Sequence, residues 1–231
     1  MGTSQVSVVL AHGAWADGSS WARVITPLIA AGHEVAAAAL PLRSFAADVA
    51  ALEETLERVP GPIVLVGHAY AGAVIAAARN TRVGALVYVT ALAPDEGETV
   101  AEVFYRAPPH PKAPQLAPDG HGLIYLPARA FAEAFAPNAT LEQQALLAAV
   151  QRPIAPACIT TRVGRPRWRE LPSWFLVAEQ DRMIVPETQR FMAQRMRARV
   201  HCHQVDHTPL VTAPAEVVEI IRAAIGELGA R

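Results

Sequence analysis

The chain has 231 residues, of which 52% are hydrophobic, enough for one large domain or for a domain that carries an insertion. It contains 20 lysine and arginine residues and 21 aspartate and glutamate residues, so the formal net charge is -1, and no long run of one sign occurs. This balance gives no electrostatic reason to expect nucleic acid or a membrane as a partner, and it favours a small neutral molecule.

The two cysteines, Cys158 and Cys202, are far apart in the sequence and lack the spacing of metal ligands. A disulfide stays open, but two free thiols in a reducing compartment is the favoured interpretation. Residues 1–5 show no basic region followed by an apolar stretch, and no apolar run reaches the roughly 18 residues of a membrane span. We therefore expect a cytoplasmic protein.

The first part of the chain alternates apolar strands with helices. Residue patterns predict strands over 6–11, 33–40, 63–66 and 85–89, and helices over 21–29, 44–59 and 71–80. Ser44 is placed to cap the second helix, and the breaker Pro60-Gly61-Pro62 follows it. This order predicts an α/β fold with a mostly parallel sheet and helices on both faces.

The alternation returns near the C-terminus, with strands expected over 174–177 and 200–205 and helices over 186–197 and 214–228. Between residues 92 and 170 it stops, and prolines cluster before two helical stretches over 128–135 and 141–150. We expect residues 1–91 and 171–231 to form the core and residues 92–170 a cap, all in one structural unit. Such a cap would cover the strand ends where open α/β sheets bind ligands.

Aromatic side chains of the cap, together with one early tryptophan, are candidates for the wall of a substrate pocket. They are Trp15, Phe104, Tyr105, Tyr125, Phe131, Phe135 and Trp168. The alternative is that each of them only packs and holds the cap together.

Residues 67–72, Gly-His-Ala-Tyr-Ala-Gly, have the frame of a nucleophile elbow, G-x-S-x-G, with Ala69 in the position of the serine. A predicted strand precedes this segment and a predicted helix follows it, as the motif requires. Gly67 and Ala71, two residues to either side, are both small enough for the tight turn. An ordinary strand-to-helix turn is the alternative, and residues elsewhere in the chain decide between the two.

A hydrolytic site also needs a base and an acid that orients the base. His207 follows the last predicted strand and is the candidate base, while Asp181 follows the strand before it and is the candidate acid. Asp206 competes with Asp181, but adjacent residues at a strand end tend to point apart. Two histidines flank Cys202, but no further ligand cluster supports a metal site there, so no metal is expected.

In the order Ala69, Asp181, His207, the chain resembles the α/β-hydrolase superfamily. The resemblance is to its compact, cap-bearing branch, which includes plant methylesterases, hydroxynitrile lyases and small bacterial serine esterases. The most specific segments are residues 9–15, 64–72 and 91–98.

The resemblance implies an α/β-hydrolase fold and cleavage of a small ester, lactone or thioester by acyl transfer to water, without a cofactor. It also implies an oxyanion hole made of the backbone N–H groups of Ala14 and Tyr70. Thr208 stands where hydroxynitrile lyases of this branch carry a lysine, which argues against cyanohydrin cleavage. The partner implied is a small, largely apolar ester-like molecule, and the protein is a possible homodimer.

Two hypotheses explain Ala69. In the favoured one, the parent is a serine hydrolase and this chain is a serine-to-alanine variant that still binds its ligand but turns it over poorly. In the other, the protein naturally has no nucleophile, and it either binds a ligand or acts as a lyase that uses His207 as a general base. The polar pair His207 and Asp181 favours the first hypothesis, because such groups in an apolar pocket cost stability unless they are used.

Overall fold

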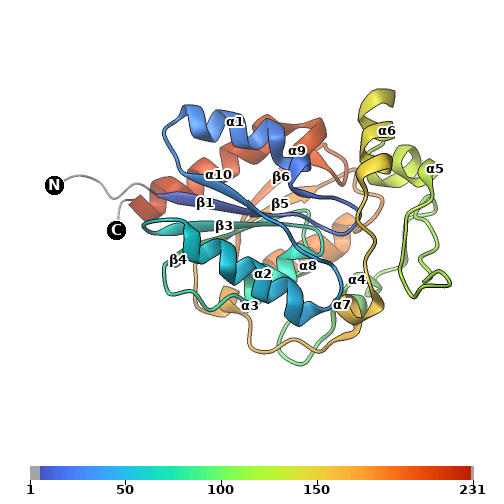
Figure 1. Ribbon diagram of the computed structural model, residues 1–231, viewed down its shortest axis with the longest axis horizontal. Helices are drawn as coiled ribbons and strands as arrows, with labels where there is room; N and C mark the ends of the chain where they lie inside the picture. Colours follow the sequence, from blue (N-terminus) through green and yellow to red (C-terminus); the bar gives the residue numbers. More distant parts are fainter. Residues whose placement is uncertain (1–5, 230–231) are drawn as a thin grey trace.

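The computed structural model describes residues 6–229, which form a six-stranded, all-parallel sheet with the strand order β2-β1-β3-β4-β5-β6 (Figure 1). The strands are β1 (Ser7–Ala11), β2 (Val35–Ala38), β3 (Ile63–His68), β4 (Val83–Val89), β5 (Ser173–Ala178) and β6 (Arg199–His203). β1, β3 and β5 are buried throughout, whereas the edge strands β2 and β6 are partly exposed. The predicted α/β fold with a parallel sheet is confirmed.

Helices cover both faces of the sheet (Figure 1). One face carries α1 (Ala22–Ala30) and α10 (Pro214–Gly229), and the other carries α2 (Phe45–Arg58), α3 (Ala71–Ala77) and α8 (Pro186–Arg195). The Ser44 side chain accepts a hydrogen bond from the Ala47 backbone N–H, so it caps α2 as predicted. The helix predicted over 71–80 ends at Ala77 because Ala78 leaves the helical region.

Between β4 and β5 the chain forms only short helices. They are α4 (Val100–Phe104), α5 (Ala128–Ala130), the π-helix η2 (Phe131–Phe135), α6 (Leu141–Val150), α7 (Pro156–Thr160) and the 3-10 helix η3 (Arg167–Arg169). Short helices outside this segment are η1 (Gly18–Trp21) and α9 (Pro209–Thr212). The helix predicted over 128–135 is thus α-helical only in its first turn. In Figure 1 α5 and α6 lie beyond the carboxyl ends of the strands.

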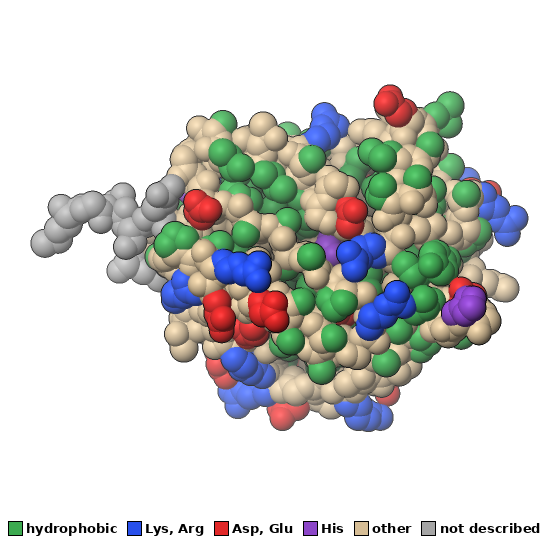
Figure 2. Space-filling view, in the orientation of Figure 1, with side chains coloured by type: hydrophobic (Ala, Val, Ile, Leu, Met, Phe, Trp, Pro, Cys, Tyr) green, Lys and Arg blue, Asp and Glu red, His purple; other side chains and the backbone are tan. Residues whose placement is uncertain are grey.

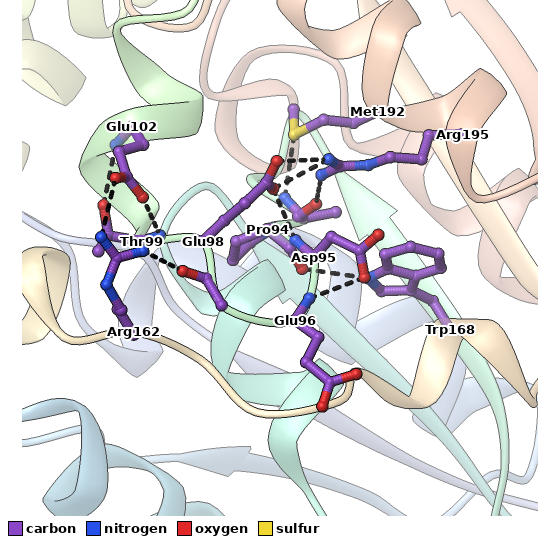
Figure 3. Close-up of polar contacts among 12 residues, drawn as sticks. Pro94, Asp95, Glu96, Glu98, Thr99, Glu102, Arg162, Trp168, Met192 and Arg195 are labelled. Carbon is purple, nitrogen blue, oxygen red and sulfur yellow. Dashed lines mark hydrogen bonds and ion pairs between the residues drawn. The ribbon is translucent and has the colours of Figure 1, made fainter.

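The chain that leads from β4 toward α4 is tied to the core by polar contacts (Figure 3). The Arg195 guanidinium on α8 donates to both carboxylate oxygens of Glu98 at 2.9 Å and to the Ala93 carbonyl oxygen at 2.6 Å. The Thr99 side chain and Glu102 form a reciprocal capping box that starts α4. These contacts fix where the chain leaves the sheet.

Residues 1–5, from which the lack of a secretory signal was inferred, lie outside the described residues. Among residues 6–229, no helix has both the length and the apolar character that a transmembrane span needs. Cys158 is buried, Cys202 is exposed, and both are free thiols. On the face that Figure 2 shows, basic and acidic side chains are interspersed.

Gly72, in the first turn of α3, lies where this helix packs closely against the end of β4 and the chain that follows it. A Cβ atom at this position would lie 2.4 Å from the Leu92 carbonyl oxygen, so Gly72→Ala should lower the free energy of unfolding by about 1–3 kcal/mol. Gly226 in α10 has no atom within 4 Å of such a Cβ, so Gly226→Ala should instead stabilise by about 0.5–1 kcal/mol. Urea unfolding measures both, and equal effects of the two substitutions would contradict the close packing at Gly72.

Candidate active site

Ala69 lies in a sharp turn between β3 and α3. Its φ of 49° is in the left-handed region, which costs a non-glycine residue of the order of 1–3 kcal/mol unless its surroundings impose it. The Ala69 carbonyl oxygen accepts hydrogen bonds from the backbone N–H groups of Leu92 at 2.9 Å and Gly72 at 3.1 Å. A Cβ at Gly67 would lie 2.8 Å from the Ala71 carbonyl oxygen, so position 67 requires glycine. The backbone is therefore that of a strained elbow and not of an ordinary turn.

His207 and Asp181 form a buried pair at the carboxyl ends of β6 and β5. The Asp181 Oδ2 atom lies 2.8 Å from His207 Nδ1, and it also accepts from Gln189 Nε2 at 2.8 Å. Asp181 Oδ1 accepts from the backbone N–H groups of Met183 and Ile184. Both oxygens of the Asp181 carboxylate thus accept hydrogen bonds. Because Asp181 binds His207 through Nδ1, the Nε2 atom of the imidazole is left available for proton transfer. Within residues 6–229, no protein group is hydrogen-bonded to that Nε2 atom.

Asp206, the alternative acid, is not hydrogen-bonded to the His207 ring. Its carboxylate accepts from the backbone N–H groups of Asn138 and Thr208 and from the Thr212 hydroxyl. It therefore joins the segment after η2 to the loop that carries His207. This arrangement agrees with the expectation that the adjacent side chains of Asp206 and His207 point apart.

One cavity brings the predicted reacting groups together. Ala69, His207, Ala14 and Tyr70 all line it. Within residues 6–229, no protein acceptor binds the backbone N–H of Ala14 or of Tyr70. Two amide donors without protein partners thus line the same cavity as the His207 imidazole and the Ala69 methyl group.

Three of the aromatic side chains predicted to line the pocket do so, namely Trp15, Phe104 and Tyr105. The other four do not line this cavity, and for them the expectation is wrong: Tyr125, Phe131, Phe135 and Trp168. Phe131 and Phe135 are fully buried in the packing of η2, Trp168 is buried with its indole N–H directed at the Pro94 carbonyl oxygen, and Tyr125 is about half exposed.

Most of the remaining wall is aliphatic and was not identified from the sequence. It is formed by Leu92, Val100, Ala101, Leu116, Ile124, Ile154, Ile159, Met183 and Ile184. Met183 and Ile184 directly follow the acid and could have been inferred from that position. Gln189 was also missed: it is fully buried, and its side chain joins Asp181 to the backbone N–H of Ala178. In the sequence, only its position eight residues after Asp181 could have indicated this contact.

The sequence model of the Alpha/beta hydrolase family matches residues 8–220. The chain belongs to this family. Three solved structures share the family's fold with it at 16–19% identity. No curated protein matches the sequence.

The first of these structures is a pyrethroid hydrolase, with 19% identity and a TM-score of 0.81 over 98% of this chain and 100% of that one. The second is a methylesterase from Arabidopsis, with 16% identity and a TM-score of 0.78 over 96% and 99%. The third is a variant of tomato methylketone synthase I, with 19% identity and a TM-score of 0.82 over 97% and 98%. At these identities the likeness concerns the fold.

His68, next to Ala69, is a fully buried histidine that is hydrogen-bonded to the backbone of His207. Its Nε2 atom lies 2.8 Å from the His207 carbonyl oxygen, so Nε2 carries the proton and donates. The Thr90 hydroxyl donates to the same oxygen at 3.0 Å. Nδ1 of His68 is buried without a partner among the described residues. Burial first, and then the neighbouring His207, lower the pKa of His68 to about 3.

This buried imidazole predicts a loss of stability in mild acid. Because the pKa of His68 is about 3 in the fold and about 6.5 in an unfolded chain, the unfolded state binds the extra proton between these values. The contribution of neutral His68 to the free energy of unfolding is full above pH 6.5 and is lost as the pH falls toward 3. The free energy of unfolding should change by up to about 1.4 kcal/mol per pH unit in this range. Urea unfolding between pH 7 and 4 should show a shallower slope in His68→Gln. The matched change at the exposed His121, His121→Gln, should leave the slope as it is, and equal slopes in both variants would contradict the assignment.

Proposed function

We propose that this chain is built as an ester hydrolase that works by acyl transfer, that it binds a small, largely apolar ester-like compound, and that Ala69 makes its turnover slow. The observation that carries the proposal is the elbow itself. Residue 69 has the strained φ of 49° that presents a side chain from the end of β3, and it lines the same cavity as His207, whose imidazole is hydrogen-bonded to Asp181. On this hypothesis the parent protein has serine at position 69.

The steps follow from the positions of the groups. Serine at position 69, deprotonated by His207 Nε2, would attack the ester carbonyl, while Asp181 holds the imidazole in the required tautomer. The backbone N–H groups of Ala14 and Tyr70 would receive the developing negative charge. His207 would then protonate the leaving alcohol, and water would release the acyl group by the same route.

The wall of the cavity supports an uncharged substrate. Among the described residues that line it, there is no Asp, Glu, Lys or Arg, and His207 is the one histidine. The indole N–H of Trp15 already donates to the Ile124 carbonyl oxygen at 2.9 Å, and the Tyr70 hydroxyl donates to Asp48 at 2.7 Å. An apolar acyl or alcohol group fits this wall, because a charged group would find no partner there. The names pyrethroid hydrolase and methylesterase of two similar folds agree with this class.

Restoring the nucleophile is the direct test. Ala69→Ser should raise the turnover of p-nitrophenyl butyrate by several orders of magnitude, because losing the nucleophile of a triad costs about a million-fold, or roughly 8 kcal/mol of barrier. Initial rates of p-nitrophenolate release, for the present chain and the variant at equal concentration, give the ratio.

The same assay has internal controls. In the Ala69→Ser background, His207→Ala and Asp181→Asn should each remove most of the gained rate, whereas Asp206→Asn should change it little unless the protein unfolds. A serine variant that cleaves none of a panel of aliphatic and aromatic esters, although its Tm is unchanged, overturns the proposal and leaves a ligand-binding protein as the explanation.

A second candidate function is proton abstraction by His207 in the chain as it stands. It needs only groups that the present chain has, namely His207 with its hydrogen-bonded partner Asp181, and it needs no nucleophile at residue 69. A base beside two amide donors is suited to removing a proton next to a carbonyl group, since the amides stabilise the enolate oxygen. One similar fold is named a synthase and not an esterase.

Deuterium exchange separates this candidate from the first. If His207 acts as the base, the present chain should exchange the methyl protons of acetophenone in D2O, as followed by proton NMR. His207→Ala should then abolish the exchange and Ala69→Ser should alter it little. Exchange no faster than in buffer, together with esterase activity in Ala69→Ser, excludes the second candidate.

A further inference from the structure

A buried hydrogen bond behind the cavity links the elbow to helix α2. The hydroxyl of Tyr70, the residue after the nucleophile position, donates to Asp48 Oδ2 at 2.7 Å. Asp48 is fully buried and Tyr70 is 3% exposed. None of the reaction steps above uses this carboxyl or this phenol, so their pairing needs an explanation of its own.

Asp48 is itself held firmly. Its Oδ1 atom accepts from the backbone N–H of Leu42 at 2.7 Å, and its own backbone N–H donates to the Ser44 carbonyl oxygen in the first turn of α2. The carbonyl oxygen of Leu42 accepts from the backbone N–H of Ala155, just before α7. The carboxyl thus lies where α2, the elbow and the segment before α7 meet. Burial raises the pKa of Asp48, so burying this group costs stability that a pair of apolar side chains would not cost.

The hydrogen bonds of the elbow indicate a role for the pair of Asp48 and Tyr70. Ala69 is held through its main chain, by Val89 on one side and by Leu92 and Gly72 on the other. For Tyr70, whose N–H is the second proposed oxyanion donor, the phenol is the side-chain attachment to the rest of the fold. A strained turn keeps its geometry only where the surroundings over-determine it. The link to α2 adds a restraint on the peptide between residues 69 and 70.

We propose that Asp48 is a positioning residue, which acts through the Tyr70 hydroxyl to fix the backbone N–H of residue 70 as an oxyanion donor. The inference rests on the proposed function in one respect, the role of that amide. The consequence is that the pair matters for the rate of the chemical step and little for substrate binding, since an amide that is displaced by a fraction of an ångström loses most where charge develops.

Kinetics in the Ala69→Ser background test the proposal. Tyr70→Phe removes only the hydroxyl, and it should lower kcat for p-nitrophenyl butyrate by about 10- to 100-fold with KM changed less than about threefold. Asp48→Asn, which keeps an acceptor, should retain more activity than Asp48→Ala. The matched control is Tyr88→Phe, because the Tyr88 hydroxyl is also buried but has no partner among the described residues. This control should keep kcat within about twofold, as it removes no hydrogen bond.

A second measurement needs no esterase activity. In the present chain labelled with ¹⁵N, the backbone amide signal of Tyr70 should shift in Asp48→Ala, which removes the acceptor of its hydroxyl, while the signal of Ala14 stays unchanged. The Tyr70 signal should be unaffected by Tyr88→Phe.

The two experiments separate the possible failures. An Ala69→Ser chain without esterase activity overturns the proposed function, but the NMR result still decides whether Asp48 positions the amide. If Tyr70→Phe keeps kcat and only lowers Tm, or if the amide signal of Tyr70 is unmoved in Asp48→Ala, the positioning role is overturned.

Discussion

The left-handed backbone at residue 69 is the constraint on which the rest of the site depends. At the end of β3 the chain must reverse into α3 within two residues, Ala69 and Tyr70, so the neighbouring residues have to be small. Gly67 approaches the Ala71 carbonyl group, and Gly72 approaches that of Leu92, at distances that no side chain allows. The left-handed conformation of Ala69, with φ of 49°, is held by backbone hydrogen bonds to Val89, Leu92 and Gly72. The turn is thereby built to present a side chain, although the one present is a methyl group.

Around this turn the protein sets a few polar groups against an apolar wall. Asp181 and His207 are almost completely buried, and the carboxylate is saturated by donors from its own loop and from Gln189. The low dielectric of such a cavity strengthens every interaction with a developing charge, and it penalises any polar group without a partner. A site of this kind discriminates by charge and by shape, and it gains most from donors that are fixed before the substrate arrives.

The segment between β4 and β5 was the least predictable part of the chain. Its place was clear because the strand and helix alternation stops there, but its interior was not. Phe131 and Phe135 were natural candidates for the pocket, yet they lie in a π-helix that turns them into the packing, where Phe135 contacts the rings of Trp15 and His207. The wall is made instead by aliphatic residues such as Ile124 and Ile154, which are brought together by an isolated antiparallel bridge. Local periodicity carries no information about a bridge between residues thirty apart.

The sequence by itself determined the sheet, its helical layers, the elbow frame and the order of Ala69, Asp181 and His207, because these depend on local patterns and on the rule that parallel strands present their carboxyl ends at one edge. Only the tertiary structure decided which aromatic rings face the cavity. It also decided that Asp206 binds backbone and hydroxyl donors and not the imidazole, and that Asp48 of α2 binds the Tyr70 hydroxyl. The physical reason is that these contacts join segments far apart in the chain. Their direction is set by packing, which no short stretch of sequence encodes.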